Sequence, residues 1–284
     1  MKNFKTIIAF VAGAAVAGTM ATAATTPTPT ITACADNRTK ALYLATNGSC
    51  PSNRSAIVIG GGSGAAMDAK TIASLVTPSV VSIKVTTTSG GGTGSGSVYK
   101  TSATSSYIVT NNHVIADGAT GGTITIELTN GDQYRATIVG RDANYDLAVI
   151  KVSVGNLPVI SLGDSSQVSV GDPVLAIGSP LGLANTVTQG IVSSLNRPVT
   201  TGTSDAQSYV DAIQTDAAIN PGNSGGALVD AQGRIIGVNS AIATLSSGGT
   251  SGNIGLGFSI PINEAKRIID EIIATGKSTR PVLE

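Results

Sequence analysis

The stretch "TITIELTNGDQYRATIV", residues 123–139, decides the fold class of this chain. Its two apolar-polar alternating runs, 123–128 and 134–139, flank the pair Asn130-Gly131. Alternation with a period of two predicts strands with one buried face, and Asn-Gly is the strongest short-range signal for a β-hairpin. The stretch therefore predicts two antiparallel strands joined by a turn.

The same kind of segment recurs from Val80 to Phe258. Short β-branched runs, broken by Gly, Asn and Asp, include "VVSIKV", "LAVIKV", "PVLAIG", "QGIVSSL" and "RIIGVN". Many short strands without intervening helices predict an all-β antiparallel barrel or sandwich.

Helical spacing appears only at the two ends of this β region. In residues 67–76, Ile72, Leu75 and Val76 fall on one face, and a proline follows. The segment "NEAKRIIDEIIATG" predicts a terminal helix with Asn263 as its N-cap and Gly276 at its end.

Composition narrows the function classes. The 284 residues carry 17 basic and 17 acidic side chains, with no basic run and few aromatic residues. Because the formal net charge is zero, the chain as a whole does not attract the negatively charged backbone of nucleic acid, and nucleic-acid binding is not expected.

The first 23 residues have the pattern of a secretory signal peptide. Lys2 and Lys5 precede an apolar stretch, and Ala21-Thr22-Ala23 has the form of a cleavage site. We expect an exported protein, released, at the cell surface or periplasmic, with a Pro/Thr-rich spacer at 24–33.

Two cysteines follow, Cys34 and Cys50. An even pair in an exported chain predicts a disulfide, which would contribute about 3 kcal/mol to stability by closing its loop. We expect a small module at 34–59, with two strands around a turn at Asp36-Asn37, then a Gly-rich linker at 60–66 and the main domain at 67–284.

The Gly-rich runs do not predict a cofactor site. Gly60, Gly62 and Ala65 fit the G-x-G-x-x-A form of a dinucleotide fingerprint, but no acidic residue lies between Asp68 and Asp117. The run 89–98 lacks the Lys-Ser/Thr pair that ends a phosphate-binding loop, so it is expected to be a flexible loop between strands. One His and two Cys do not make an ordinary zinc site, so no metal is expected.

Nucleophilic chemistry is better supported. His113 is the only imidazole available to activate a hydroxyl. Ser224 lies among glycines in "INPGNSGGALV" (219–229), where backbone N–H groups can converge on one point. Asp146 directly precedes a buried-looking strand and could orient His113, whereas the competing Asp142 is expected further out in a polar loop.

The order His, Asp, Ser in an all-β chain is the order of chymotrypsin-like proteases. Longer motifs agree in sequence: "YIVTNNHVI", "DANYDLAVIKV", "LAIGSPLGLANTVTQGIVS", "TDAAINPGNSGGALVD" and "IGLGFSIP". From Met67 to Glu284 the chain resembles the protease domain of the HtrA/DegP family. The resemblance implies two six-stranded antiparallel β-barrels of the chymotrypsin type with a C-terminal helix.

The resemblance also implies roles for particular residues. His113 would be the general base, Asp146 its orienting partner and Ser224 the nucleophile. The backbone N–H groups of Gly222 and Ser224 would form the oxyanion hole.

Substrate binding is implied for a second group of residues. The strand 237–243 would pair with the substrate backbone, with Ser240 near the S1 pocket and Ile219 and Ala241 lining it. Asp216 would be structural, so we expect cleavage of unfolded or damaged proteins after small aliphatic residues.

Regulation and assembly are the remaining expectations. Asn223 stands where digestive relatives carry an activating aspartate, so order in loops 179–186 and 244–253 is expected to set activity instead.

Relatives often continue into PDZ domains, which are not expected within this chain. A homotrimer is a trait of the family. The alternatives are a protease-like domain that binds misfolded chains without cutting, and a dinucleotide oxidoreductase.

Overall fold

The computed structural model describes residues 31–38, 42–45, 49–59, 67–88, 90–179, 185–201, 208–241 and 255–279. The expected signal peptide and Gly-rich linker, and most of the two expected regulatory loops, lie outside these ranges. The chain divides into two compact units, Met1–Ala65 and Ala66–Glu284, and each is considered by itself.

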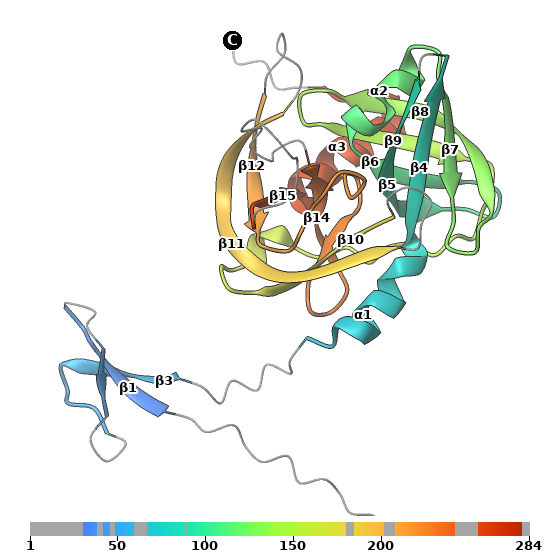
Figure 1. The fold of residues 1–284 in the computed structure, drawn as a ribbon. Helices are drawn as coiled ribbons and strands as arrows, with labels where there is room; N and C mark the ends of the chain where they lie inside the picture. Colours follow the sequence, from blue (N-terminus) through green and yellow to red (C-terminus); the bar gives the residue numbers. More distant parts are fainter. Residues whose placement is uncertain are drawn as a thin grey trace, which may run out of the picture. The chain divides into compact units, whose positions relative to one another are not determined.

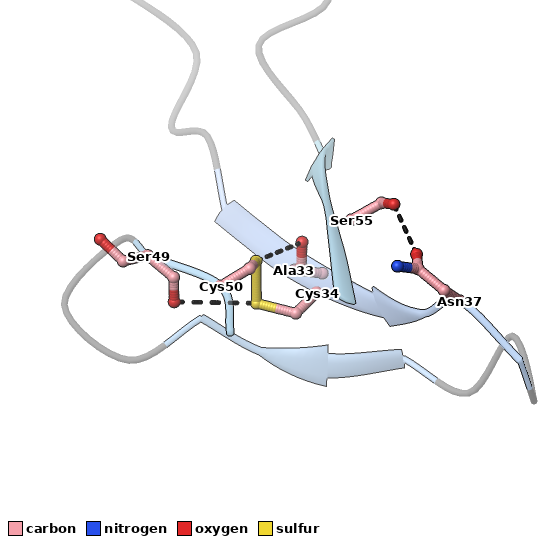
Figure 2. Close-up of a disulfide and its surroundings, with 6 residues drawn as sticks. All are labelled: Ala33, Cys34, Asn37, Ser49, Cys50 and Ser55. Atoms are coloured by element: carbon pink, nitrogen blue, oxygen red, sulfur yellow. Dashed lines mark hydrogen bonds between the residues drawn. A yellow bond between two sulfur atoms is a disulfide. The ribbon is translucent and has the colours of Figure 1, made fainter. Parts of the chain in front are cut away.

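The first unit contains a small three-stranded sheet (Figure 1). Strand β1 (Ile31–Asp36) lies between β2 (Leu42–Leu44) and β3 (Arg54–Ile59) and pairs antiparallel with both. The predicted disulfide is confirmed, because Cys34 is bonded to Cys50 beside this sheet (Figure 2). The two strands expected around a turn at Asp36-Asn37 are present as β1 and β2, but a third strand, β3, completes the sheet, and β1 begins inside the segment expected to be spacer.

The second unit begins with a closed six-stranded barrel. Its strands, in order around the barrel, are β4 (Val80–Thr87), β5 (Gly90–Thr101), β6 (Ser106–Thr110), β9 (Leu147–Val152), β8 (Gln133–Asp142) and β7 (Thr123–Glu127). The predicted hairpin at 123–139 is confirmed, since β7 pairs antiparallel with β8 and Leu128 N donates to Asp132 O at the turn. The inward-facing residues of this barrel include Ile126 of β7 and Ile150 of β9, which are both fully buried.

A second closed barrel follows in the chain (Figure 1). Its order is β10 (Pro173–Gly178), β11 (Thr186–Thr201), β12 (Ser208–Thr215), β15 (Gly257–Pro261), β14 (Ile235–Ser240) and β13 (Ala227–Val229). One apolar cluster joins the barrels, because Val109 and Val149 of the first pack in it with Leu175 and Val238 of the second. The predicted two-barrel, all-β fold is confirmed.

The predicted helices are present, with corrections. Helix α1 (Ala69–Val76) is capped by Asp68 and buries Ile72 and Val76, whereas Leu75 is 64% exposed. All three side chains approach Gly233, where a Cβ atom would lie 3.2 to 3.7 Å from them. Helix α3 (Ile262–Thr275) ends at Gly276, as predicted. None of the helices in the described ranges is long and apolar enough to cross a membrane.

The predicted N-cap of α3 is wrong. Pro261 occupies the cap position, and the side chain of Asn263 instead donates to Asp164 Oδ1 and accepts from Ser165 N. Asn263 therefore ties α3 to the short 3-10 helix η2 (Ser165–Gln167). A second 3-10 turn, η1 (Thr77–Ser79), follows α1.

Two further expectations within the β region are wrong. A short helix, α2 (Asn112–Ala119), interrupts the strands directly after β6. The Gly-rich run expected to be a loop is most of β5. A Cβ atom at Gly94 would lie 2.6 Å from Val114, and one at Gly96 would lie 2.6 Å from Ile108. Glycine is needed in β5 because the barrel wall packs tightly against it, a tertiary demand that local propensity does not reveal.

Candidate active site

His113 and Asp146 lie together, although 33 positions separate them in the chain. His113 is the second residue of α2, and Asp146 lies in the turn before β9. His113 Nδ1 is 2.8 Å from Asp146 Oδ2 and 3.0 Å from Oδ1. The backbone N–H of His113 also donates to Oδ1, at 3.0 Å. The carboxylate thus fixes both the ring and the main chain of His113.

Asp146 is held in an unusual backbone conformation. Its φ is 52° and the residue is 2% exposed. Left-handed φ costs a non-glycine residue of order 1 kcal/mol or more, so surrounding contacts must stabilise it. Asn111 Nδ2 donates to the Asp146 carbonyl at 2.9 Å, and Ser240 Oγ donates to Oδ2 at 3.3 Å.

Two further residues hold Asp146 that the sequence did not reveal in this role, Asn111 and Ser240. Asn111 is fully buried and directly precedes α2, so the only sign of it in the sequence was a polar residue between an apolar strand and His113. Ser240 was expected near the specificity pocket, and the bond of its hydroxyl to the Asp146 carboxylate is an additional contact.

Asp142 does not face His113. It is the last residue of β8 and 7% exposed, so its expected place in an outer polar loop is wrong. Its Oδ1 accepts from the N–H groups of Asn144 and Tyr145, both at 3.0 Å, and Oδ2 accepts from Ser278 Oγ at 2.7 Å. Asp142 therefore stabilises the turn that presents Asp146.

Ser224 lies in the tight turn before β13 and is 4% exposed. Its Oγ accepts a hydrogen bond from Ala241 N at 3.1 Å. No hydrogen bond joins Ser224 to His113 within the described ranges. A hydroxyl that accepts from an amide still carries its own proton, which leaves the Ser224 proton available for transfer.

The backbone of this turn has the features of an anion site. Gly222 has φ 97°, in the region that favours glycine. The Asn223 N–H donates to Asn220 O, and the Asn223 carbonyl accepts from Gly226 N. In the part of the chain that the structure describes, the N–H groups of Gly222 and Ser224 have no acceptor. Two such donors, with one residue between them, can bind a developing oxyanion.

Gly225 brings the turn against the first barrel. Its φ is +83°, and a Cβ atom there would lie 2.1 Å from Ser95 O and 2.3 Å from Thr110 Oγ1. Only glycine allows this approach, which brings the Ser224 turn against the end of the strand that leads to His113.

Two of the residues expected to bind substrate, Ile219 and Ala241, come before β13 and directly after β14 of the second barrel. Ile219 is fully buried, and a Cβ atom at Gly257 would lie 3.1 Å from its Cδ1. Ala241 follows β14 and contacts Ser224 through its N–H. Asp216 Oδ1 accepts from Ile191 N at 2.7 Å, so this carboxylate is bound to the backbone of β11.

The expected pairing of the strand 237–243 with substrate is wrong for its first part. Gly237 and Val238 are paired with β13 on one side and β15 on the other. Asn239 also has backbone partners on both sides, Gly226 and Ser259. An edge for a substrate strand can therefore begin only beyond these residues.

Comparisons with known proteins agree with this geometry. Residues 94–238 match the model of the trypsin-like peptidase domain. The serine protease PepD of Mycobacterium tuberculosis is 51% identical over 224 residues, which cover 75% of this chain and 48% of that protein. The Do-like serine protease HtrA of Lactococcus lactis subsp. cremoris is 44% identical over 194 residues, covering 67% of this chain and 47% of that protein.

A DegP-like periplasmic serine endoprotease of Chlamydia pneumoniae is 49% identical over 177 residues, covering 62% of this chain and 34% of that protein. Among solved structures, the HtrA-type protease AlgW with a tripeptide is similar at 40% identity and a TM-score of 0.63, covering 74% of this chain and 64% of that one. The chain spans about half or less of the length of these curated relatives.

Proposed function

Because this chain belongs to the trypsin-like peptidase family, with HtrA/DegP serine proteases among its relatives, we propose that it is a serine endopeptidase that uses His113, Asp146 and Ser224. The observation that carries the proposal is the pair of contacts between His113 Nδ1 and the buried Asp146 carboxylate. In the same unit, Ser224 lies in a turn with two N–H donors that have no acceptor among the described residues. This is the set of groups that acyl transfer requires.

The proposed reaction proceeds through an acyl-enzyme. His113 Nε2 takes the Ser224 proton as Oγ attacks the scissile carbonyl carbon, and Asp146 stabilises the imidazolium that forms. The N–H groups of Gly222 and Ser224 donate to the oxyanion. The imidazolium then protonates the leaving amine, and water attacks the ester with His113 again acting as base.

The proposed substrates are unfolded or damaged polypeptides, cut after small aliphatic residues. The support is Ile219, whose side chain is fully buried and lies close to Gly257. In the wall of the pocket, where the resemblance puts it, this side chain would limit the depth open to a P1 side chain. The Asp216 carboxylate, bound to Ile191 N, is not directed at a basic P1 residue.

Export and assembly belong to the same proposal. The sequence pattern of residues 1–23 and the periplasmic name of the Chlamydia relative support transfer across the cytoplasmic membrane. A homotrimer is proposed from the family resemblance, and light scattering of the purified protein tests it.

Casein degradation tests the activity. The wild type is expected to cleave casein, and Ser224→Ala is expected to lose essentially all cleavage, a loss of about 10⁶-fold in kcat. Ser97→Ala is the matched control, because Ser97 is a fully buried serine whose Oγ has no hydrogen-bond partner. Equal cleavage by wild type and Ser224→Ala would contradict the proposal. A wild type that suppresses aggregation of unfolded proteins without cutting them would support the binding alternative.

A further inference from the structure

Ser95 is a fully buried residue of β5 whose N–H, hydroxyl and carbonyl all have hydrogen-bond partners, none of which is a side chain of the candidate triad. Its N–H donates to Ser224 O at 2.8 Å, and its Oγ donates to Gly222 O at 2.6 Å. Its Oγ also accepts from Ser179 N at 2.7 Å, and its carbonyl accepts from Thr110 Oγ1 at 2.7 Å. One residue of the first barrel therefore donates to both carbonyls that flank Asn223: its side chain bonds Gly222 O, and its backbone N–H bonds Ser224 O.

We propose that Ser95 is a positioning residue that holds the oxyanion site in its binding conformation. The inference rests on the proposed function, since it concerns how the same site is held in place. Ser95 contacts neither the triad side chains nor the place of the reacting atoms, and it acts through the backbone of Gly222.

The Ser95 hydroxyl has one proton, and its direction is fixed by its neighbours. Because Oγ accepts the Ser179 N–H, the proton is free to point to the Gly222 carbonyl. The three groups form a chain, from Ser179 N–H through the hydroxyl to Gly222 O, in which each hydrogen bond strengthens the next.

Fixing the Gly222 carbonyl restricts the peptide on which the oxyanion donors depend. Gly222 at φ 97° has more rotational freedom than any other residue type, so its peptide can turn at low cost unless it is held. Ser95 Oγ holds this peptide at its oxygen, and Asn220 O holds it at the Asn223 N–H. The neighbouring N–H groups of Gly222 and Ser224 are thereby kept in place.

The test compares Ser95→Ala with Ser97→Ala, two truncations of fully buried serines on the same strand. Ser95→Ala removes only Oγ and leaves both backbone contacts. We expect kcat on a peptide substrate to fall roughly tenfold to a hundredfold with KM nearly unchanged, less than the 10²–10³-fold loss when an oxyanion donor itself is removed. The rate of Ser224 labelling by an alkyl fluorophosphonate should fall in parallel. Ser97→Ala should match the wild type in both measurements.

The outcomes separate the two proposals. If the wild type neither cleaves casein nor labels with fluorophosphonate, the proposed function fails. If the wild type is active and folded Ser95→Ala retains its kcat within twofold, or loses activity only through KM, the role of Ser95 is overturned. If Ser95→Ala does not fold, Ser95→Cys carries the test, because a thiol is a weak donor: a several-fold lower kcat at constant KM supports the role, and wild-type kcat overturns it.

Discussion

The Asp146 carboxylate bonds His113 twice, through the ring Nδ1 at 2.8 Å and through the backbone N–H at 3.0 Å. The same side chain thus selects the imidazole orientation and secures the first turn of α2, which carries it. Asn111 and Ser240 add a bond to the Asp146 carbonyl and a bond to its carboxylate. The orientation of the proposed general base therefore depends on residues from both barrels.

Asp146→Asn should lower kcat by about 10⁴-fold, because an amide in place of the carboxylate favours the wrong imidazole tautomer. Steady-state kinetics on a peptide substrate measure the effect, and Asp132→Asn, a change in the β7–β8 turn, is the control. A loss of less than tenfold would show that Asp146 does not orient the base.

Ile219→Ala should shift cleavage toward larger P1 residues. Removing the buried side chain beside Gly257 opens space at the base of the proposed pocket, and a difference of one or two methylene groups is worth about 1–3 kcal/mol of discrimination. Mass spectrometry of casein fragments gives the P1 residues for both proteins. An unchanged P1 profile would exclude Ile219 as a determinant of specificity.

Gly225→Ala should destabilise the main unit by about 3 kcal/mol or more, because the new Cβ meets Ser95 O and the φ of +83° is strained. Gly131→Ala is the matched control. Gly131 has φ +88° but nothing within 4 Å of its Cβ position, so it should cost only about 1 kcal/mol. Urea unfolding compares the two, and equal losses would contradict the close approach at Gly225.

The double substitution Cys34→Ser/Cys50→Ser should lower the stability of the small sheet by about 3 kcal/mol, as closing this loop constrains the unfolded chain. Hydrogen exchange of the amides in β1 and β3 should become faster. Casein cleavage should stay at the wild-type level, since the proposed site lies wholly in the second compact unit. Loss of cleavage would show that the sheet acts on the protease unit.

Asp211→Asn should raise stability slightly at pH 7 but not at pH 3. Burial, and then the negative charge of Asp211, raise the pKa of Glu264 above its ordinary value of 4.5, while Arg267 and a hydrogen bond from Tyr145 oppose the shift. A raised folded-state pKa favours the protonated form, so stability falls as pH rises from the ordinary pKa through the raised one. Removing the like charge should recover about 0.3 kcal/mol at pH 7, a small amount because Glu264 is only partly buried.

Thermal unfolding at the two pH values measures this difference. The decisive readout is the sign of the difference in melting temperature between Asp211→Asn and the wild type at pH 7. A lower melting temperature for the variant would show that Asp211 stabilises α3 through another contact.

The fold class and the chemistry could be read from local patterns. Alternating runs and an Asn-Gly turn predicted the strands, because side-chain direction alternates along any strand regardless of what surrounds it. A single histidine constrained the candidate base to His113, and the glycines around Ser224 pointed to a tight turn.

Other features depended on contacts that no local pattern contains. The Gly-rich run became β5 because its glycines pack against Val114 and Ile108. Leu75 is 64% exposed although its spacing matches that of Ile72, and the β13–β14 turn approaches it at Gly233, where a Cβ atom would lie 3.3 Å from Leu75 Cδ2.

By itself, then, the sequence determined an all-β protein with a disulfide and a His, Asp, Ser order, because periodicity and residue type are properties of the chain. Only the tertiary structure decided that Asn111 and Ser240 hold Asp146, and that Ser95 lies between Gly222 and Ser179. Those hydrogen bonds join residues from 35 to 127 positions apart. Such partners meet only after two barrels have closed and packed together.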